Sequence, residues 1–222
     1  MPAYENGKDT YRRIIDAAKR LYYLKGPSKT TNAQIADEAC IQLSSLTYYF
    51  KNKRELLRDV THEIIHNLSS FAADISIEKS ELTPIIYLLL LYFVLYTDSN
   101  HYRQFAEATK KYYIINDKKN HTHYVQLIKS LCDLAGYPIQ GINTPIGIEN
   151  IHTIIVNSSM VMLRSSHAGL INIDYKYIAK WNIDFVMWTL GIQNSDAVDA
   201  AFDEAVEIFE HADMSRYDLS FI

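Results

Sequence analysis

Cysteine, proline and glycine are all scarce in this chain. Five prolines and seven glycines among 222 residues leave long stretches without the residues that interrupt helices. The two cysteines, Cys40 and Cys132, are too few for a disulfide framework and cannot supply a four-ligand zinc site. These absences exclude a disulfide-stapled secreted domain and predict a largely helical protein of the reducing cytoplasm.

Long apolar runs and targeting segments are also missing. The strongest apolar run, Ile85–Tyr96, has twelve residues, whereas a helix that spans a bilayer needs about 20. The first residues, Met1–Lys8, do not combine a basic start with an apolar core, as a secretion signal does. We therefore expect a buried helix over the apolar run and a cytoplasmic chain that is neither exported nor inserted in a membrane.

Charge is distributed unevenly along the chain. Hydrophobic residues make up 48% and charged residues 22%, which are the proportions of a globular protein. Residues 1–60 hold eleven Lys and Arg against seven Asp and Glu, a net +4, whereas residues 61–222 hold eleven against nineteen, a net −8. A basic segment joined to an acidic remainder suits the binding of a polyanion at one end only.

The N-terminal segment has the spacing of three helices. Apolar residues recur at three- and four-residue steps over Asp9–Lys25, which predicts the first helix. Thr31 and Gln34 form a capping-box pattern, which predicts a short second helix that ends near Ala39. Helical spacing resumes over Leu43–Phe50. Two short helices joined by about three residues are the layout of a helix-turn-helix.

Helical spacing continues through the rest of the chain. Asn52 and Glu55 have the spacing of a helix cap, which predicts a long helix over residues 53–75. Further helices are expected over 82–98, 100–115, 119–136, 147–168, 174–191 and 195–212. The stretch 137–147, rich in proline and glycine, is expected to be a surface loop. The predicted fold class is all-α.

Four runs of residues between Arg12 and Val60 carry a family resemblance. They are Ile-Ile-Asp-Ala-Ala-Lys-Arg-Leu, Thr-Thr-Asn-Ala-Gln-Ile-Ala, Leu-Thr-Tyr-Tyr-Phe and Lys-Asn-Lys-Arg-Glu-Leu-Leu. In their order and spacing they resemble the DNA-binding domain of TetR-type transcriptional regulators. The rest of the chain resembles that family only in length and helical pattern. The resemblance implies a helix-turn-helix DNA-binding domain over 1–53 and a helical ligand-binding and dimerisation domain over 54–222.

Three positions depart from the pattern of that family. Cys40 stands where the turn glycine is usual, Gln42 where a serine or threonine often begins the recognition helix, and Thr47 where a tyrosine is common. A positive φ at a cysteine costs about 1 kcal/mol, so the turn is expected to be slightly reshaped if position 40 needs that φ. Thr47 has no phenol to reach a phosphate, a contact that neighbouring Tyr48 and Tyr49 can supply instead.

The recognition helix is expected to enter the major groove of B-form DNA with its first residues at base edges. Gln42, Ser44 and Ser45 can hydrogen-bond there, and Leu43 can contact a thymine methyl group. This helix has no arginine, so DNA shape and the two tyrosines are expected to contribute to recognition. Phosphate contacts are expected from Thr31, Asn32, Lys51 and Lys53. The complete predicted DNA-binding set is Thr31, Asn32, Gln42, Leu43, Ser44, Ser45, Thr47, Tyr48, Tyr49, Lys51 and Lys53.

Tyrosine is unusually frequent, with seventeen in the chain. A tyrosine offers a flat apolar face and a hydroxyl, which together suit the binding of a flat organic molecule. The resemblance implies a pocket for such an effector between the central helices, with ordinary packing as the alternative for each tyrosine. The candidate ligand-binding residues are His66, Tyr92, Tyr96, Phe105, Tyr124, Asn157, Met160 and Arg164. For Arg164, a salt bridge with a nearby acid is the alternative to an anion contact.

The expected helices over 147–168 and 174–191 are apolar on more than one face, so they need cover on several sides. The resemblance implies a two-fold four-helix interface between two copies, and burial within one subunit is the alternative. His121 and His123 point to different sides of a helix, so they are interpreted as surface residues and not as metal ligands. No catalytic triad, phosphate-binding loop or zinc-protease motif occurs in the sequence, and no cofactor is expected.

The predicted function is that of a ligand-responsive DNA-binding regulator. It is expected to repress transcription by binding a palindromic operator as a homodimer, and to be released by a small organic effector. Two alternatives remain: a helical interaction protein that keeps the fold without sequence-specific DNA binding, and a helical enzyme with acid–base residues in a tyrosine-lined cavity.

Overall fold

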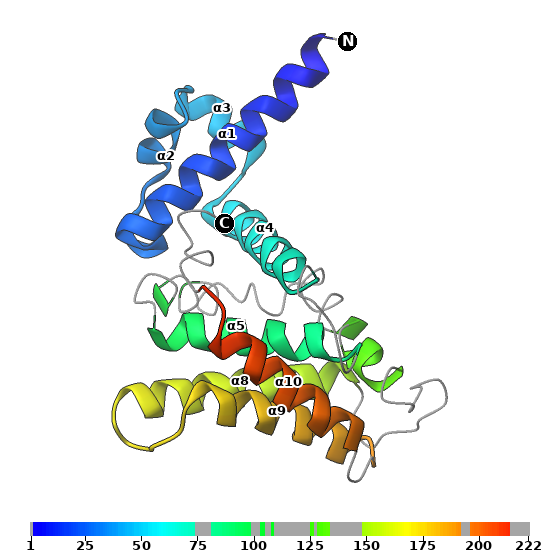
Figure 1. The fold of residues 1–222 in the computed structure, drawn as a ribbon. Coiled ribbons are helices and arrows are strands. Elements are labelled where there is room, and N and C mark those ends of the chain that lie inside the picture. Colours follow the sequence, from blue (N-terminus) through cyan, green and yellow to red (C-terminus); the bar gives the residue numbers. More distant parts are fainter. Residues whose placement is uncertain are drawn as a thin grey trace. The chain divides into compact units, whose positions relative to one another are not determined.

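A computed structural model describes residues 2–73, 81–98, 103–104, 108, 125–126, 128–133, 148–191 and 196–213. Throughout these ranges the regular elements are helices (Figure 1), which confirms the all-α fold. The elements are α1 (Pro2–Lys25), the 3₁₀ turn η1 (Pro27–Lys29), α2 (Asn32–Glu38), α3 (Leu43–Tyr49), α4 (Lys53–Ala73), α5 (Thr83–Asp98), α8 (Ile148–His167), α9 (Tyr175–Thr189) and α10 (Asp196–Glu210).

The predicted helices agree closely with these bounds. The first helix is the exception, because α1 begins at Pro2 and not at the predicted Asp9. The expected helices over 100–115 and 119–136 contain described helical residues at 103–104, 108, 125–126 and 128–133. The expected loop over 137–147 lies outside the described residues.

The chain forms two compact units. The first contains α1, α2, α3, residues 53–67 of α4 and residues 103, 104 and 108, and the second contains α5, α8, α9 and α10. The units divide inside α4, after Asn67. The domain boundary predicted between residues 53 and 54 falls at the start of the same helix.

The core of the first unit lies between α1 and the two helices that follow it. Ile14, Ala17 and Leu21 recur at helical spacing along α1 and are buried, as the sequence predicts. They pack towards α2, which in turn contacts α3, and fully buried Ile35 and Leu46 complete this core. Each large aliphatic side chain buried in this way contributes about 1.5–3 kcal/mol.

The second unit is organised around α5, which packs against α8, α9 and α10 (Figure 1). Ile86, Tyr87 and Leu90 of α5 are all buried, because a helix this apolar needs cover around most of its girth. At the first turn of α5 the hydroxyl of Thr83 donates to the buried carboxylate of Glu204 on α10. A carboxylate at this end of a helix is also favoured by the helix dipole.

A buried polar pair sets the register of α8 against α9. The Ser159 hydroxyl donates to Oδ1 of Asn182 at 3.0 Å, and Nδ2 of Asn182 donates to the Ile178 carbonyl at 2.5 Å. Ser159 and Asn182 are both buried. Since an unmatched buried polar group is costly, sliding one helix along the other would break this pairing.

Candidate nucleic-acid interface

The start of α2 is fixed by a complete capping box. The Gln34 backbone N–H donates to the Thr31 hydroxyl at 3.2 Å, and the Thr31 backbone N–H donates to the Gln34 side chain at 2.9 Å. The box satisfies two backbone donors at the helix start, and it confirms the cap predicted from sequence. Thr31 is exposed and Asn32 is half-buried, so both lie where a phosphate can approach.

The turn after α2 closes as a Schellman motif around Cys40. The Cys40 N–H donates to the Asp37 carbonyl at 3.0 Å, and the Ile41 N–H donates to the Ala36 carbonyl at 2.9 Å. Cys40 has a φ of 52°, the one positive φ at a non-glycine among the described residues. Glycine usually occupies this position of the motif. The cysteine therefore adopts the positive φ that usually calls for glycine, and both hydrogen bonds of the motif are formed.

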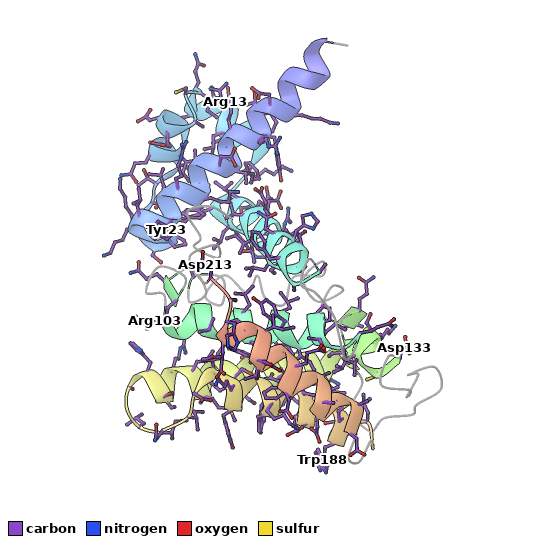
Figure 2. The ribbon with its side chains drawn as sticks, viewed as in Figure 1. Arg13, Tyr23, Arg103, Asp133, Trp188 and Asp213 are labelled. Carbon is purple, nitrogen blue, oxygen red and sulfur yellow. The ribbon has the colours of Figure 1, made fainter. Side chains whose placement is uncertain are left out.

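Arg13, which is labelled in Figure 2, joins α1 to this turn. Its guanidinium Nη2 donates to the carbonyls of Ala39 and Cys40. These carbonyls end α2, where a positive charge also meets the negative end of the helix dipole. The local sequence pattern predicts only that Arg13 lies on a polar face of α1. It does not predict these two contacts, because the partners lie 26 and 27 residues away in the chain.

One face of α3 anchors the helix and the other is open. Leu46 and the following Phe50 are buried, whereas Leu43 is 47% exposed and Tyr48 is 84% exposed. The predicted DNA-binding residues around α3 fall into two groups by exposure. The exposed ones are Gln42, Leu43, Ser44, Thr47, Tyr48 and Lys51. The half-buried ones are Ser45, Tyr49 and Lys53. The structure thus brings polar, apolar and aromatic side chains together on an open helix face.

Two side chains of α3 are already engaged within the helix. The Ser44 hydroxyl lies 3.4 Å from Oε1 of Gln42, and the Thr47 hydroxyl donates to the Ser44 carbonyl at 2.9 Å. The hydroxyl of Thr47 therefore has a backbone partner within its own helix. We therefore expect exposed Tyr48, and not Thr47, to contact a phosphate.

Tyr48 and Tyr49 have different surroundings, because adjacent residues on a helix point in different directions. The Tyr48 ring meets the Tyr49 ring edge-on, with centroids 5.5 Å apart and planes at 89°. The Tyr49 hydroxyl donates to the Gly7 carbonyl at 3.2 Å, which joins the end of α3 to the early turns of α1. Tyr49 therefore supports the helix, and Tyr48 is the aromatic side chain that points outward.

The start of α4 confirms the second predicted cap. The Glu55 N–H donates to Oδ1 of Asn52 at 3.0 Å, and the Lys51 N–H donates to the Glu55 carboxylate at 3.0 Å. The Lys51 side chain is exposed. By contrast, Nζ of Lys53 donates to the Thr30 carbonyl at 2.6 Å. Lys53 therefore joins α4 to the residue before the α2 cap, and Lys51 is the better placed of the two for a phosphate.

A side-chain hydrogen bond also connects α1 to α4. The Tyr11 hydroxyl donates to Oδ2 of Asp59 at 2.9 Å, and the Tyr11 ring lies 5.5 Å from that of Phe50. Burial and the neighbouring Asp59 carboxylate raise the pKa of Tyr11, so this phenol remains a hydrogen-bond donor across the physiological pH range.

The candidate ligand-binding residues are spread over several positions. Met160 is buried on α8, whereas His66 on α4 and both Asn157 and Arg164 on α8 are exposed. Tyr92 and Tyr96 lie on α5, but their side chains are outside the described part of the structure, as are the whole residues Phe105 and Tyr124. Their assignment to an effector pocket stays a prediction.

Exposed apolar residues lie on α8 and α9, which pack against each other. On α8, Ile154 and Val161 share a face with Asn157 and Arg164, and Val161 is 57% exposed. On α9, the Trp181 and Phe185 rings stack with centroids 5.3 Å apart. Trp188, one turn further on, is 72% exposed and projects from the unit in Figure 2. These are the two helices predicted to form a dimer interface.

A capped helix-turn-helix, followed by a unit built of packed helices, defines the class of helix-turn-helix regulators. The model of the family of bacterial regulatory proteins called the tetR family matches residues 14–60. This range contains the second half of α1, all of α2 and α3, and the start of α4. Over these residues the chain is similar to the tetR family, as its sequence motifs predict.

Several known proteins are similar to this chain in sequence or fold. The HTH-type transcriptional regulator TtgR of Pseudomonas putida is 31% identical over 81 residues, which are 36% of this chain and 38% of TtgR. The TetR-family repressor QsdR of R. erythropolis has a TM-score of 0.55 at 16% identity, over 83% of this chain and 96% of QsdR. FadR of Thermus thermophilus, a TetR-family repressor solved with lauroyl-CoA, has a TM-score of 0.50 at 15% identity, over 84% and 97%.

These likenesses differ in what they cover. The match to TtgR spans less than two fifths of that regulator's length. At 15–16% identity, QsdR and FadR show that the fold is shared. Among the described residues, no helix is both long and apolar enough to cross a membrane.

Proposed function

We propose that this protein is a transcriptional repressor that binds a palindromic operator as a homodimer and releases it when a small organic effector binds. The observation that carries the proposal is the open face of α3, where Gln42, Leu43, Ser44 and Tyr48 are all exposed. Buried Leu46 holds the opposite face of the helix in the core. A helix held in this way can enter a major groove with its first residues at the base edges.

The residues of this face favour a particular mode of recognition. Gln42 can pair with adenine through two hydrogen bonds, and Leu43 can contact a thymine methyl group. With no arginine on α3, a strong contact with guanine is not available from this helix. We therefore expect a site rich in A·T pairs at the positions that α3 reads, held by phosphate contacts from Thr31, Lys51 and Tyr48.

Selection of binding sites from a pool of random duplexes, followed by mobility-shift titration at several salt concentrations, tests DNA binding. Gln42→Ala should change the preferred base at one position, since a bidentate contact discriminates by about 1–3 kcal/mol. Lys51→Ala should weaken binding to all sequences alike. It should also lower the magnitude of the slope of log K against log salt concentration by about 0.9, because one phosphate contact is lost. Lys129→Ala, an exposed lysine of the second unit, is the control and should change neither quantity.

Two results would contradict this assignment. Selection that enriches no sequence, with retardation that does not depend on salt, would favour the interaction protein that has lost DNA binding. Equal effects of Gln42→Ala and Lys51→Ala on base preference would show that α3 does not read the bases as assigned.

Dimerisation through α8 and α9 is supported by their exposed apolar side chains. Val161 and Trp188 leave large apolar surfaces open to water, and a second copy related by a two-fold axis would cover both. Each recognition helix would then enter one of two successive major grooves, about 34–36 Å apart. Such an arrangement requires a roughly palindromic operator.

Sedimentation velocity of the full chain tests the dimer. Trp188→Glu and Val161→Glu should each shift the protein towards a monomer, because a charge would be buried in the interface. Leu24→Glu is a matched control, since Leu24 of α1 is 65% exposed and lies outside the proposed interface. A dimer unaffected by both interface variants would show that other surfaces join the copies.

Release by an effector is the remaining part of the proposal. A ligand lowers DNA affinity only if it binds the DNA-free state more tightly, and a tenfold loss of affinity corresponds to about 1.4 kcal/mol. The shared fold of FadR, solved with lauroyl-CoA, makes acyl compounds a reasonable starting set beside flat aromatic ones. Compounds that raise the melting temperature should also release the selected DNA, and Met160→Trp should abolish both effects if the pocket includes Met160.

A further inference from the structure

A cavity of about 520 Å³ lies in the first unit, beside the turn that connects α1 to α2. Its volume is within the range of sites for small organic molecules. None of its described lining residues is among the predicted effector-binding residues. They are Lys25, Gly26, Pro27, Ser28, Lys29, Arg103, Gln104 and Ala108.

The charge of the described lining residues is one-sided. Three of the described lining residues are cationic and none is acidic. Lys25 and Lys29 are exposed, and within the described part of the chain neither ammonium group has a hydrogen-bond or salt-bridge partner. By contrast, Lys19 in the same unit lies 2.5 Å from the Glu63 carboxylate. Like charges repel each other, and a bound anion relieves the repulsion between two ammonium groups.

The turn that supplies the two lysines is held in place before any ligand binds. Gly26 has a φ of 78°, and its N–H donates to the Tyr22 carbonyl at 2.9 Å. The buried Thr30 hydroxyl donates to the Gly26 carbonyl at 2.9 Å. A site whose backbone is already ordered loses less entropy on binding.

The other wall of the cavity comes from residues far along the sequence. Gln104 closes directly on the turn, since a Cβ atom at Gly26 would lie 2.5 Å from its Oε1 atom. Next to it, Arg103 supplies a guanidinium, whose fork of donors matches a phosphate or a carboxylate. Buried Pro27 and Ala108 add an apolar surface.

We propose that this cavity binds a small organic anion. Lys25, Lys29 and Arg103 hold its phosphate or carboxylate group, and its apolar part lies against Pro27 and Ala108. The anion contacts both the turn that leads into α2 and the wall formed by residues 103, 104 and 108. Its binding therefore stabilises the packing of these two parts on each other.

Amide NMR titrations and calorimetry on the full chain, without DNA, test this site with three probes. Methyl phosphate, hexyl phosphate and hexanoate separate the contributions of the head group and the apolar part. Hexyl phosphate should bind at least tenfold more tightly than methyl phosphate, because burial of about two of its methylene groups already supplies that factor. Saturable shifts are expected at Gly26 and Ser28. Tighter binding of hexyl phosphate than of hexanoate would assign the phosphate group, and the reverse order would assign the carboxylate.

Charge-removing variants identify the cations that act. Lys29→Gln and Arg103→Gln should each lower the affinity about tenfold, which corresponds to about 1.4 kcal/mol. Arg12→Gln, at an exposed position on α1 outside the cavity, should leave it unchanged. Melting curves establish that each variant is folded.

Three results would overturn the proposal. The first is the absence of saturable shifts at Gly26 and Ser28 with all three probes. The second is an equal effect of Lys29→Gln and Arg12→Gln on anion affinity. The third is a loss of DNA affinity in Lys25→Gln and Lys29→Gln with no change in anion binding, which would make these lysines part of the DNA interface. Since the titrations use no DNA, they can succeed or fail independently of the proposed repressor function.

Discussion

The guanidinium Nη2 of Arg13 lies 2.9 Å from the carbonyl oxygen of Cys40. The same group donates to Ala39, so one side chain of α1 satisfies two carbonyls at the end of α2. The turn that follows sets the direction in which α3 leaves. The orientation of α3, the helix proposed to read DNA, therefore depends on α1 as well as on the turn itself.

Removal of this contact should weaken both folding and DNA binding. Arg13→Ala should lower the free energy of unfolding by about 1.5–3 kcal/mol, the range for a hydrogen bond to a charged group, and should reduce DNA affinity by releasing the turn. Urea denaturation and fluorescence anisotropy with the selected duplex measure the two effects. Arg12→Ala, at an exposed neighbouring position, is the matched control. An unfolding free energy equal to that of the control would show that the guanidinium does not stabilise the turn.

Cys40→Gly should stabilise the protein by about 1 kcal/mol, because a glycine adopts a φ of 52° without the steric penalty of a Cβ atom. Cys40→Ala separates the backbone from the thiol, since alanine keeps the Cβ atom and should leave stability nearly unchanged. Thermal and urea denaturation of both variants provide the measurement. An equal gain from alanine and glycine would attribute the effect to loss of the thiol instead.

Gly26→Ala should lower the free energy of unfolding by about 1–2 kcal/mol, because the φ of 78° is unfavourable for any residue with a Cβ atom. The close Gln104 Oε1 atom adds little to this loss of stability, since it is the end of a flexible side chain that can move away. The double variant Gly26→Ala with Gln104→Ala should therefore remain destabilised relative to Gln104→Ala alone. Full recovery in the double variant would show that the steric contact, and not the backbone, sets the loss.

The two cysteines should react at very different rates. Burial, with a smaller effect of Asp133, raises the pKa of the Cys132 thiol from its ordinary value of 9.0 to about 12, whereas Cys40 is exposed. In mildly alkaline buffer a thiol reagent should label Cys40 in the native protein and Cys132 only after unfolding. Cys40→Ala should abolish the fast phase. Fast labelling of Cys132 in that variant would contradict its burial.

The same pKa shift predicts a pH dependence of stability. Between pH 9 and about 12 the unfolded chain loses the Cys132 proton while the folded chain keeps it. The unfolded state then binds fewer protons, so this thiol lowers the free energy of unfolding as the pH rises through that window. Comparison of wild type with Cys132→Ala in urea denaturation, below pH 9 and within the window, isolates the contribution. An identical pH dependence in the two proteins would assign the change to other groups.

Local patterns were sufficient to predict the elements that rest on neighbouring residues. The caps at Thr31 and Asn52 each depend on a partner three residues away, and the apolar stripe of α1 depends on helical periodicity. These features need only the backbone geometry of a helix, so sequence rules capture them.

Contacts between distant residues were not predictable in the same way. The phosphate contact of Lys53 stays a prediction, but the hydrogen bond from its ammonium group to Thr30, 23 residues earlier in the chain, is not evident from the sequence. Tyr49 reaches Gly7 across 42 residues. On α8, periodicity places Asn157 and Arg164 on a single face, but which face is open depends on the packing of α9. Each of these outcomes requires the tertiary arrangement, which the local pattern does not contain.

The hydrogen bond from Tyr49 to Gly7 has a practical consequence for the handling of this protein. It holds the beginning of α1 beside the end of the helix proposed to read DNA, so a purification tag fused ahead of α1 would be carried to the same end of the domain. A polyhistidine or other charged tag there would alter the measured affinity for duplexes, and a cleavable fusion is the appropriate choice for every titration described above.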